Sequence, residues 1–119
     1  MGKLENYNQL LNMLQYGRQN AVNVNHLTDK FDVTNLLEFK QKVRELAQEA
    51  RFNGHWLIGD NNGYYLALTR AEWESYKSKR LLAINNELKA FANCDNISLA
   101  DLIKNVYRII PTDKNYELF

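Results

Sequence analysis

Two short apolar segments on either side of a turn-forming stretch are the feature that most restricts the fold of this chain. Aromatic and branched residues occupy positions 56–58 and 64–66, on either side of Asp60-Asn61-Asn62-Gly63. Asn and Gly tolerate the positive φ angles that a tight reversal of an extended chain requires. The pattern therefore predicts a β-hairpin over residues 54–66.

Helical patterns precede this hairpin. Apolar residues recur at a 3-4-3 spacing from Leu4 to Leu14, which predicts a helix over residues 4–16 that Gly17 ends. An extended segment over residues 20–22 follows. A short helix then begins after an Asn N-cap and continues to Phe31.

A third helix is predicted over residues 35–53, because Asn35 and Glu38 have the spacing of an N-terminal capping pair. Its apolar residues fall on one face: Leu36, Phe39, Val43, Leu46, Ala47 and Ala50. The opposite face is polar and consists of Lys40, Gln41, Arg44, Glu45, Gln48 and Arg51.

Two more helices are predicted after the hairpin. Thr69 and Glu72 have the capping-box spacing and open a long helix over residues 70–91. A polar break follows, and then an amphipathic helix that the single proline, Pro111, ends. The apolar positions of this last helix are Leu99, Leu102, Ile103, Val106 and Ile110.

This order of elements predicts a mainly α protein with a small β-hairpin: a winged helix-turn-helix followed by a long helix and a C-terminal amphipathic helix. The winged-helix domain with its long helix would span residues 1–92, and residues 93–119 would pack on the same domain or at a dimer interface. Trp56 and Trp73 are expected in the core. Tyr64 and Tyr65 alternate along a strand, so one is expected to be buried and the other exposed.

Composition excludes several classes of protein. The net charge is +1 at pH 7, so the chain is not a polycation that coats nucleic acid without specificity. Cys94 is the single cysteine, which excludes an intrachain disulfide and a cysteine-based zinc site and favours a cytoplasmic location. No run of about 18 apolar residues exists, so no membrane span is expected.

No constellation of residues predicts catalysis. His26 and His55 lie far apart in the sequence and lack a third ligand at metal-like spacing, so no metal or other cofactor is expected. Nucleophile–base orders and glycine-rich phosphate loops are also missing from the sequence. A binding module is therefore predicted rather than an enzyme. Lys40, Lys42 and Arg44 gather in the first half of the third helix, the part of a recognition helix that meets base edges.

Three segments together resemble a known family: Tyr16-Gly17-Arg18-Gln19-Asn20-Ala21-Val22, the stretch from Val43-Arg44-Glu45-Leu46 to Gly54, and Gly63-Tyr64-Tyr65-Leu66. They look like the small winged-helix proteins of phages and prophages of Gram-positive bacteria. That family has a "YGRENAI" start, an "LR-x-L" recognition helix, a "GYYL" wing strand and a basic post-wing helix in this order. The resemblance covers residues 4–92 and implies a DNA-binding protein of replication or transcription control. The chain departs from the family at the wing tip, which carries Asp60 and no Lys or Arg.

The expected DNA contacts fall into three groups. Major-groove contacts are expected from Lys40, Gln41, Arg44 and Gln48, and phosphate contacts from Arg51, Lys77, Lys79 and Arg80. Asn61 and Asn62 either bond the sugar-phosphate backbone or serve only as turn-formers. Each cation has the alternative role of an ordinary solvated surface charge.

The sequence therefore leaves two functions open. The first is a protein that binds double-stranded DNA through the helix over residues 35–53. The second is a winged-helix protein–protein interaction module without DNA binding. The apolar stripe of the C-terminal helix is expected to fold back on the chain, to form a homodimer, or to meet a host or phage replication protein.

Overall fold

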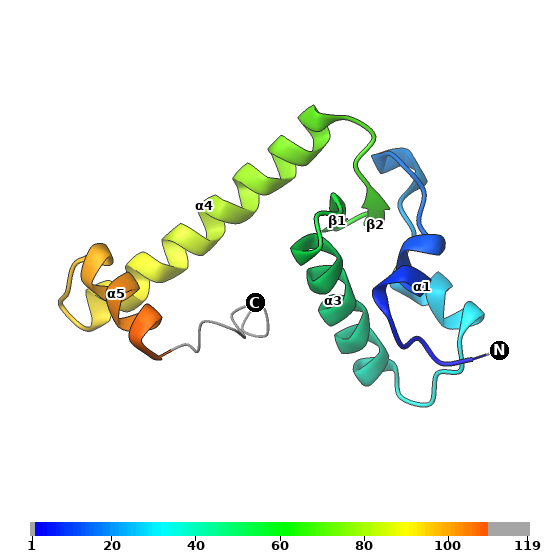
Figure 1. Ribbon diagram of the computed structural model, residues 1–119, viewed down its shortest axis with the longest axis horizontal. Helices are drawn as coiled ribbons and strands as arrows, with labels where there is room; N and C mark the ends of the chain where they lie inside the picture. Colours follow the sequence, from blue (N-terminus) through cyan, green and yellow to red (C-terminus); the bar gives the residue numbers. More distant parts are fainter. Residues whose placement is uncertain (1, 110–119) are drawn as a thin grey trace. The chain divides into compact units, whose positions relative to one another are not determined.

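The computed structural model describes residues 2–109, and the side chains of residues 2–106. As predicted, the protein is mainly helical, with a two-stranded antiparallel hairpin followed by a long helix and a shorter C-terminal helix (Figure 1). It divides into two compact units, Met1–Trp73 and Glu74–Phe119. The predicted positions of Ile110 and Pro111 lie outside the described residues.

The first unit contains most of the elements. In chain order they are α1 (Tyr7–Asn12), the 3-10 turn η1 (Arg18–Asn20), α2 (Val24–Leu27), the 3-10 turn η2 (Thr28–Lys30), α3 (Leu36–Phe52), β1 (Leu57–Asp60) and β2 (Gly63–Leu66). The long helix α4 (Arg70–Cys94) begins in this unit and continues into the second, which also contains α5 (Leu99–Ile109).

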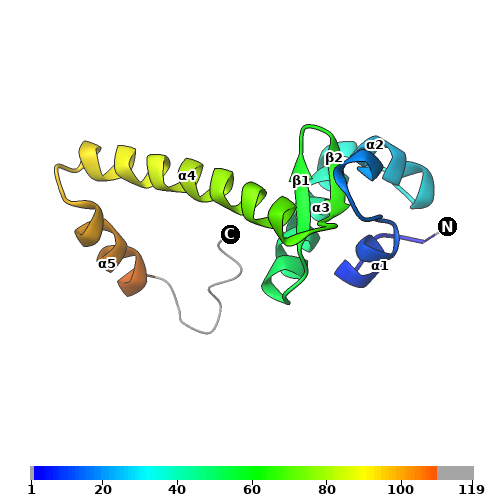
Figure 2. The ribbon, with the colours of Figure 1, turned by 90° about the horizontal axis from the view of Figure 1, so that it is seen from above.

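The hairpin forms where the sequence predicts it. Strands β1 and β2 pair antiparallel, with Leu57 opposite Leu66 and Asp60 opposite Gly63 (Figure 2). At the turn, the Asn62 N–H donates to Asp60 Oδ1 over 2.8 Å, and Gly63 has a φ of +119°. The Asp, Asn and Gly residues of the turn therefore close it through a side-chain cap and a backbone angle that only glycine adopts without strain.

The second edge of β2 is paired as well. Val22 and Tyr64 exchange two backbone hydrogen bonds of 2.8 and 2.9 Å. This confirms the predicted extended segment at Val22, whereas Asn20 belongs to the 3-10 turn η1. Farther along β2, Leu66 donates to the Gln15 carbonyl and accepts from the Gly17 N–H, each over 2.9 Å. The chain on both sides of η1 thus lies along the hairpin.

The core of the first unit collects apolar side chains from every major element. Leu10, Leu27, Val43, Leu57 and Ile58 are its largest fully buried members. The predicted inner face of α3 is buried at Phe39, Val43, Leu46, Ala47 and Ala50, whereas Leu36 at the start of the helix is exposed, contrary to the prediction. Helix α1 and strand β1 pack against α3. These contacts fix the direction in which the outer face of α3 points.

Helix α1 is shorter than the range predicted from the apolar spacing. Asn6 and Gln9 form a reciprocal capping box, which starts the helix after residue 6. The chain is extended again at Gln15, because its carbonyl pairs with β2. Leu4 and Leu14 are still buried, but from the extended segments that flank the helix.

The expected burial of both tryptophans was wrong. Trp56 is 41% exposed and Trp73 is half-buried. Their rings stack on each other, with centroids 6.1 Å apart and planes at 2°. Tyr65 is buried and its neighbour Tyr64 is half-buried.

Local signals fix the limits of α4 and α5. Thr69 Oγ1 accepts from the Glu72 N–H at the start of α4, and Ser98 Oγ accepts from the Asp101 N–H at the start of α5. Between the helices Asn96 has a φ of +54°, and the Ile97 N–H donates to the Ala92 carbonyl over 3.0 Å. This is the Schellman motif, with Asn in the left-handed position, so the predicted polar break is a defined helix end. Among the described residues, no helix combines the length and hydrophobicity of a membrane span.

Candidate nucleic-acid interface

The outer side of α3 carries its positive and negative charges on different flanks. A helix turns by about 100° per residue, so Lys40, Arg44 and Arg51 share one flank, which we call the cationic flank. Gln41 and Gln48 lie at the middle of the outer side, between the two flanks. The other flank carries Glu38, Glu45 and Glu49.

Lys42 does not join the cationic flank. It lies two residues from both Lys40 and Arg44, and a step of two residues turns a helix to nearly its opposite side. It therefore falls beside Glu38 and Glu45. The cluster of three cations seen in the sequence is divided between two sides of the helix.

The strongest candidates on the cationic flank are Lys40 and Arg44. Arg44 is exposed and Lys40 is half-buried, and neither forms an ion pair with another residue of the described chain. Gln41 donates to Glu45 Oε1 over 3.3 Å, a bond between exposed side chains that a ligand can replace. These three side chains are available to a partner.

Arg51 and Gln48 have a structural role that the sequence did not indicate. The Arg51 Nε–H donates to the Leu57 carbonyl over 2.8 Å, and its Nη1 donates to Gln48 Oε1 over 3.1 Å. Arg51 is half-buried and joins the end of α3 to β1. Its substitution would disturb the hairpin as well as any ligand contact.

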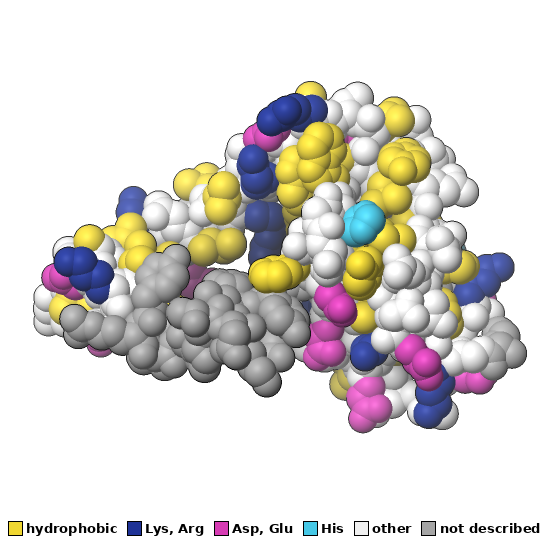
Figure 3. Space-filling view, viewed as in Figure 1, with side chains coloured by type: hydrophobic (Ala, Val, Ile, Leu, Met, Phe, Trp, Pro, Cys, Tyr) yellow, Lys and Arg dark blue, Asp and Glu magenta, His cyan; other side chains and the backbone are white. Residues whose placement is uncertain are grey.

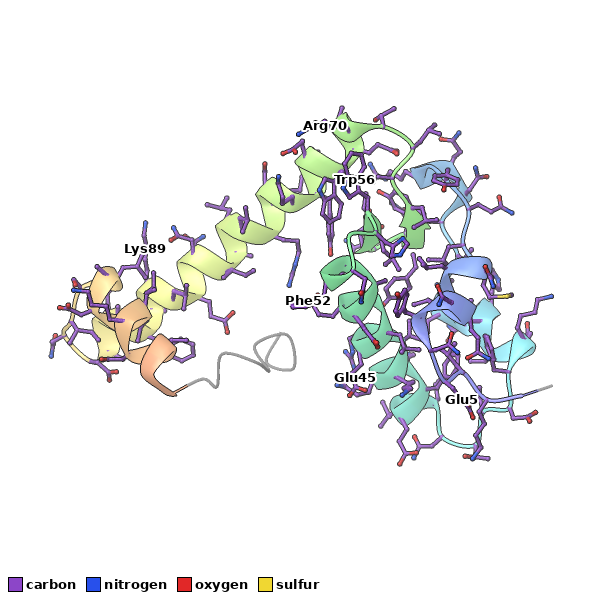
Figure 4. All side chains as sticks on the ribbon, in the orientation of Figure 1. Glu5, Glu45, Phe52, Trp56, Arg70 and Lys89 are labelled. Carbon is purple, nitrogen blue, oxygen red and sulfur yellow. The ribbon has the colours of Figure 1, made fainter. Side chains whose placement is uncertain are left out.

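The exposed apolar residues of α3 lie on its outer side. Leu37 is 77% exposed and Phe52 is 64% exposed. Figure 4 shows Phe52 and Glu45 projecting from the same side of the helix, as their spacing of seven residues requires. On the first unit in the view of Figure 3, basic and acidic side chains alternate and do not form a continuous positive field.

Arg18 lies beside the turn of the hairpin, and the sequence did not predict a cation there. With its amide oxygen turned toward the guanidinium, Asn62 accepts from Arg18 Nε over 2.7 Å and from Nη2 over 3.0 Å. Arg18, Gln19, Ala21 and Asn62 line an open hollow beside the turn. Asn61 is exposed at the tip. The pairing of Val22 with Tyr64 carries Arg18 to this place, so the predicted extended segment was the available signal.

The carboxylate at the hairpin turn is engaged within the fold. Asp60 Oδ1 caps the turn, and its Oδ2 accepts from the Tyr65 hydroxyl over 3.2 Å. Burial raises the pKa of Tyr65, and the nearby charge and hydrogen bond of Asp60 raise it further, while Arg18 acts in the opposite direction. Asp60 therefore stabilises the turn and, together with burial, favours the protonated form of the Tyr65 hydroxyl.

Glu72 joins three segments of the first unit. Its Oε1 accepts from the Leu68 N–H over 2.7 Å, and its Oε2 accepts from the Arg18 N–H over 3.3 Å. It does not complete the predicted reciprocal box with Thr69, because its carboxylate bonds these two N–H groups instead. The start of α4, the end of the hairpin and the start of η1 are thereby held together.

The predicted phosphate contacts of α4 belong to the second unit. Lys77 Nζ pairs with Glu74 Oε2 over 3.0 Å, and both side chains are more than 40% exposed. Lys79 and Arg80 are exposed. These three cations are therefore carried by a different unit from α3 and the hairpin.

The described residues contain no group of three or more His, Cys, Asp or Glu side chains that could hold a metal ion. His55 lies against Tyr7, with ring centroids 5.7 Å apart. Comparison of the chain with protein-family models, curated proteins and solved structures finds no match.

Proposed function

We propose that the first unit is a winged helix-turn-helix that binds double-stranded DNA, with α3 as the recognition helix and the hairpin as the wing. The order of elements supports this proposal. An extended segment at Val22 lies between α1 and α2, and it pairs with the second strand of the hairpin that follows α3. The same order characterises winged helices, in which the wing strands extend a small sheet. The resemblance to winged-helix proteins of phages and prophages favours a role in replication or transcription control.

The observation that carries the proposal is the cationic flank of a helix whose opposite face is anchored in the core. Arg44 and Lys40 can donate to guanine O6 and N7 in the major groove. Gln41 can bond adenine through its amide once it leaves Glu45. Buried residues such as Val43 and Ala50 hold the helix axis, so these side chains approach the groove without reordering the backbone.

Phosphate contacts would come from the wing and from α4. The guanidinium of Arg18, held beside Asn62, is the cation that the wing sequence lacks. Asn61 lies at the exposed tip, where its amide can donate to a phosphate oxygen. Lys77, Lys79 and Arg80 are proposed as further phosphate contacts.

A second candidate function is a protein-interaction module. Leu37 and Phe52 expose apolar side chains on the face of α3 that DNA would occupy. Exposed apolar residues on one face are typical of a protein partner. The net charge of +1 also suits a protein partner as well as it suits DNA.

Titration of the full-length protein against fluorescent random duplex DNA at low salt separates these functions. The DNA-binding proposal requires an affinity that falls linearly with salt on logarithmic axes. For a selected site, Arg44→Ala should lower the affinity by about 1–3 kcal/mol and relax the preference at one base pair. Lys89→Ala removes another exposed charge, on α4 and outside the proposed contacts, and should leave affinity within error (Figure 4).

The result that overturns DNA binding is the absence of any complex at micromolar protein and low salt, since even non-specific DNA-binding proteins associate under these conditions. Equal losses in the Arg44 and Lys89 variants would exclude α3 as the recognition helix. Circular dichroism of each variant checks that the helices are retained.

A further inference from the structure

We propose that the protein forms a homodimer in which the α4 helices of two copies pack antiparallel. The described residues of the second unit include almost no buried core. Ala92 is the single buried residue of α4, and the helix exposes Leu81 (56%), Leu82 (62%), Ile84 (41%) and Phe91 (56%). A pair of helices of this size cannot bury enough apolar surface to be stable alone, and small units of this kind commonly use oligomerisation to supply a core.

Most of this exposed surface forms one stripe along α4 and its C-terminal cap. We define the α4 stripe by six residues: Lys77, Leu81, Ile84, Leu88, Phe91 and Asp95. Their spacings are 4-3-4-3-4, the heptad spacing of a coiled-coil seam. The stripe is apolar in its middle, with a cation at one end and an anion at the other.

In the described part of the chain, most of the stripe is exposed. The Schellman turn at Asn96 ends α4, and near this end Ala92 is 3% exposed and Leu88 is half-buried. Ile84 and Phe91 lie on the other side of Leu88 around the helix and are exposed. On α5, Ile103 is 38% exposed and adds to the apolar surface of this unit.

The stripe is complementary to itself under a two-fold axis. Its sequence of spacings is the same in both directions, so a second copy in antiparallel orientation matches it residue by residue. Leu81 then meets the partner's Phe91, and Ile84 meets the partner's Leu88. At the ends, Lys77 meets the partner's Asp95.

Charge selects this orientation over the parallel one. A parallel pair would place Lys77 against its own copy and Asp95 against its own copy, and both contacts are repulsive. The ion pair of Lys77 with Glu74 is an exposed pair within one helix. The ammonium group has three donors, so Lys77 can keep this pair and still reach a partner carboxylate. A second copy of this chain is therefore the occupant that the stripe fits.

Light scattering of the full-length protein on a sizing column tests the proposal. The expected mass is twice the chain mass of 14.0 kDa at tens of micromolar protein. Leu81→Glu should give a monomer. Leu82→Glu changes the neighbouring residue, which is at least as exposed but lies off the stripe, and should remain dimeric.

Charge exchange and a distance measurement test the orientation. Lys77→Glu should raise the dimer dissociation constant by tenfold or more, and adding Asp95→Lys in the same chain should restore it. A spin label on the exposed Cys94 should report a separation of about 24 Å or more in the antiparallel dimer, from the helical rise per residue.

A monomer at every concentration up to about 100 µM would overturn the dimer, and so would equal effects of the Leu81 and Leu82 substitutions. A Cys94 separation of only about 10 Å would overturn the antiparallel orientation, because parallel helices pack at this distance. None of these measurements uses DNA. The dimer proposal and the DNA-binding proposal can therefore be refuted independently of each other.

Discussion

Gly63→Ala tests the frame that holds the wing in place. Gly63 has a φ of +119°, and a Cβ added there would lie 2.5 Å from the Val22 carbonyl oxygen. The substitution must therefore strain the backbone and push away the segment that pairs with β2.

The magnitude follows from these two effects. An alanine in this backbone region costs about 1–3 kcal/mol. Displacing Val22 breaks its two hydrogen bonds with Tyr64, each worth about 1 kcal/mol. The free energy of unfolding should fall by about 3–5 kcal/mol, which is a large share of the stability of a small unit.

Gly54→Ala is the matched control. Gly54 has a φ of +91°, but nothing lies within 4 Å of its added Cβ, so only the backbone cost applies. This variant should lose about 1–3 kcal/mol. The difference between the two variants isolates the contact with Val22.

Urea unfolding followed by tryptophan emission measures this difference, because both tryptophans lie in the first unit. If Gly63→Ala is as stable as Gly54→Ala, the extended segment at Val22 does not close the sheet, and the winged-helix proposal loses the support of its order of elements.

Three further outcomes are expected. Arg18→Ala should reduce the slope of log affinity against log salt by about one, whereas Asn62→Ala, which keeps the cation, should leave the slope unchanged. Equal slopes for both variants would contradict a phosphate contact by Arg18. Arg51→Ala should lower the free energy of unfolding by about 2 kcal/mol in urea, through loss of its bonds to Leu57 and Gln48, and an unchanged midpoint would contradict this structural role. The fold raises the pKa of Tyr65 and so favours its protonated form. The stability advantage of the native protein over Tyr65→Phe should therefore be complete below the unfolded pKa of 10.0 and shrink as the pH rises above it. A constant difference in stability across alkaline pH would refute the assignment.

The sequence predicted most helix starts, because these depend on residues three positions apart. Asn35 and Thr69 each cap the helix that their spacing indicates. The hairpin followed in the same way from its turn residues. Signals of this kind are local, and the structure retains them.

The contacts that the sequence did not predict join segments far apart along the chain. Arg18 reaches Asn62 only because Val22 pairs with β2, and Arg51 reaches the Leu57 carbonyl only because the hairpin folds back on α3. Counting cations along α3 also failed at Lys42, because closeness in sequence does not mean a shared face of a helix.

The Arg51 guanidinium also shields the outer edge of the hairpin. The Trp56 carbonyl accepts from the Ala67 N–H on the other side of the hairpin. Successive carbonyls of a strand point to opposite edges, so the Leu57 carbonyl points away from β2, and there it accepts from Arg51. An uncovered strand edge is a template on which other chains add strands and form aggregates. Loss of this arginine would therefore expose the hairpin to intermolecular strand addition, in addition to weakening the fold.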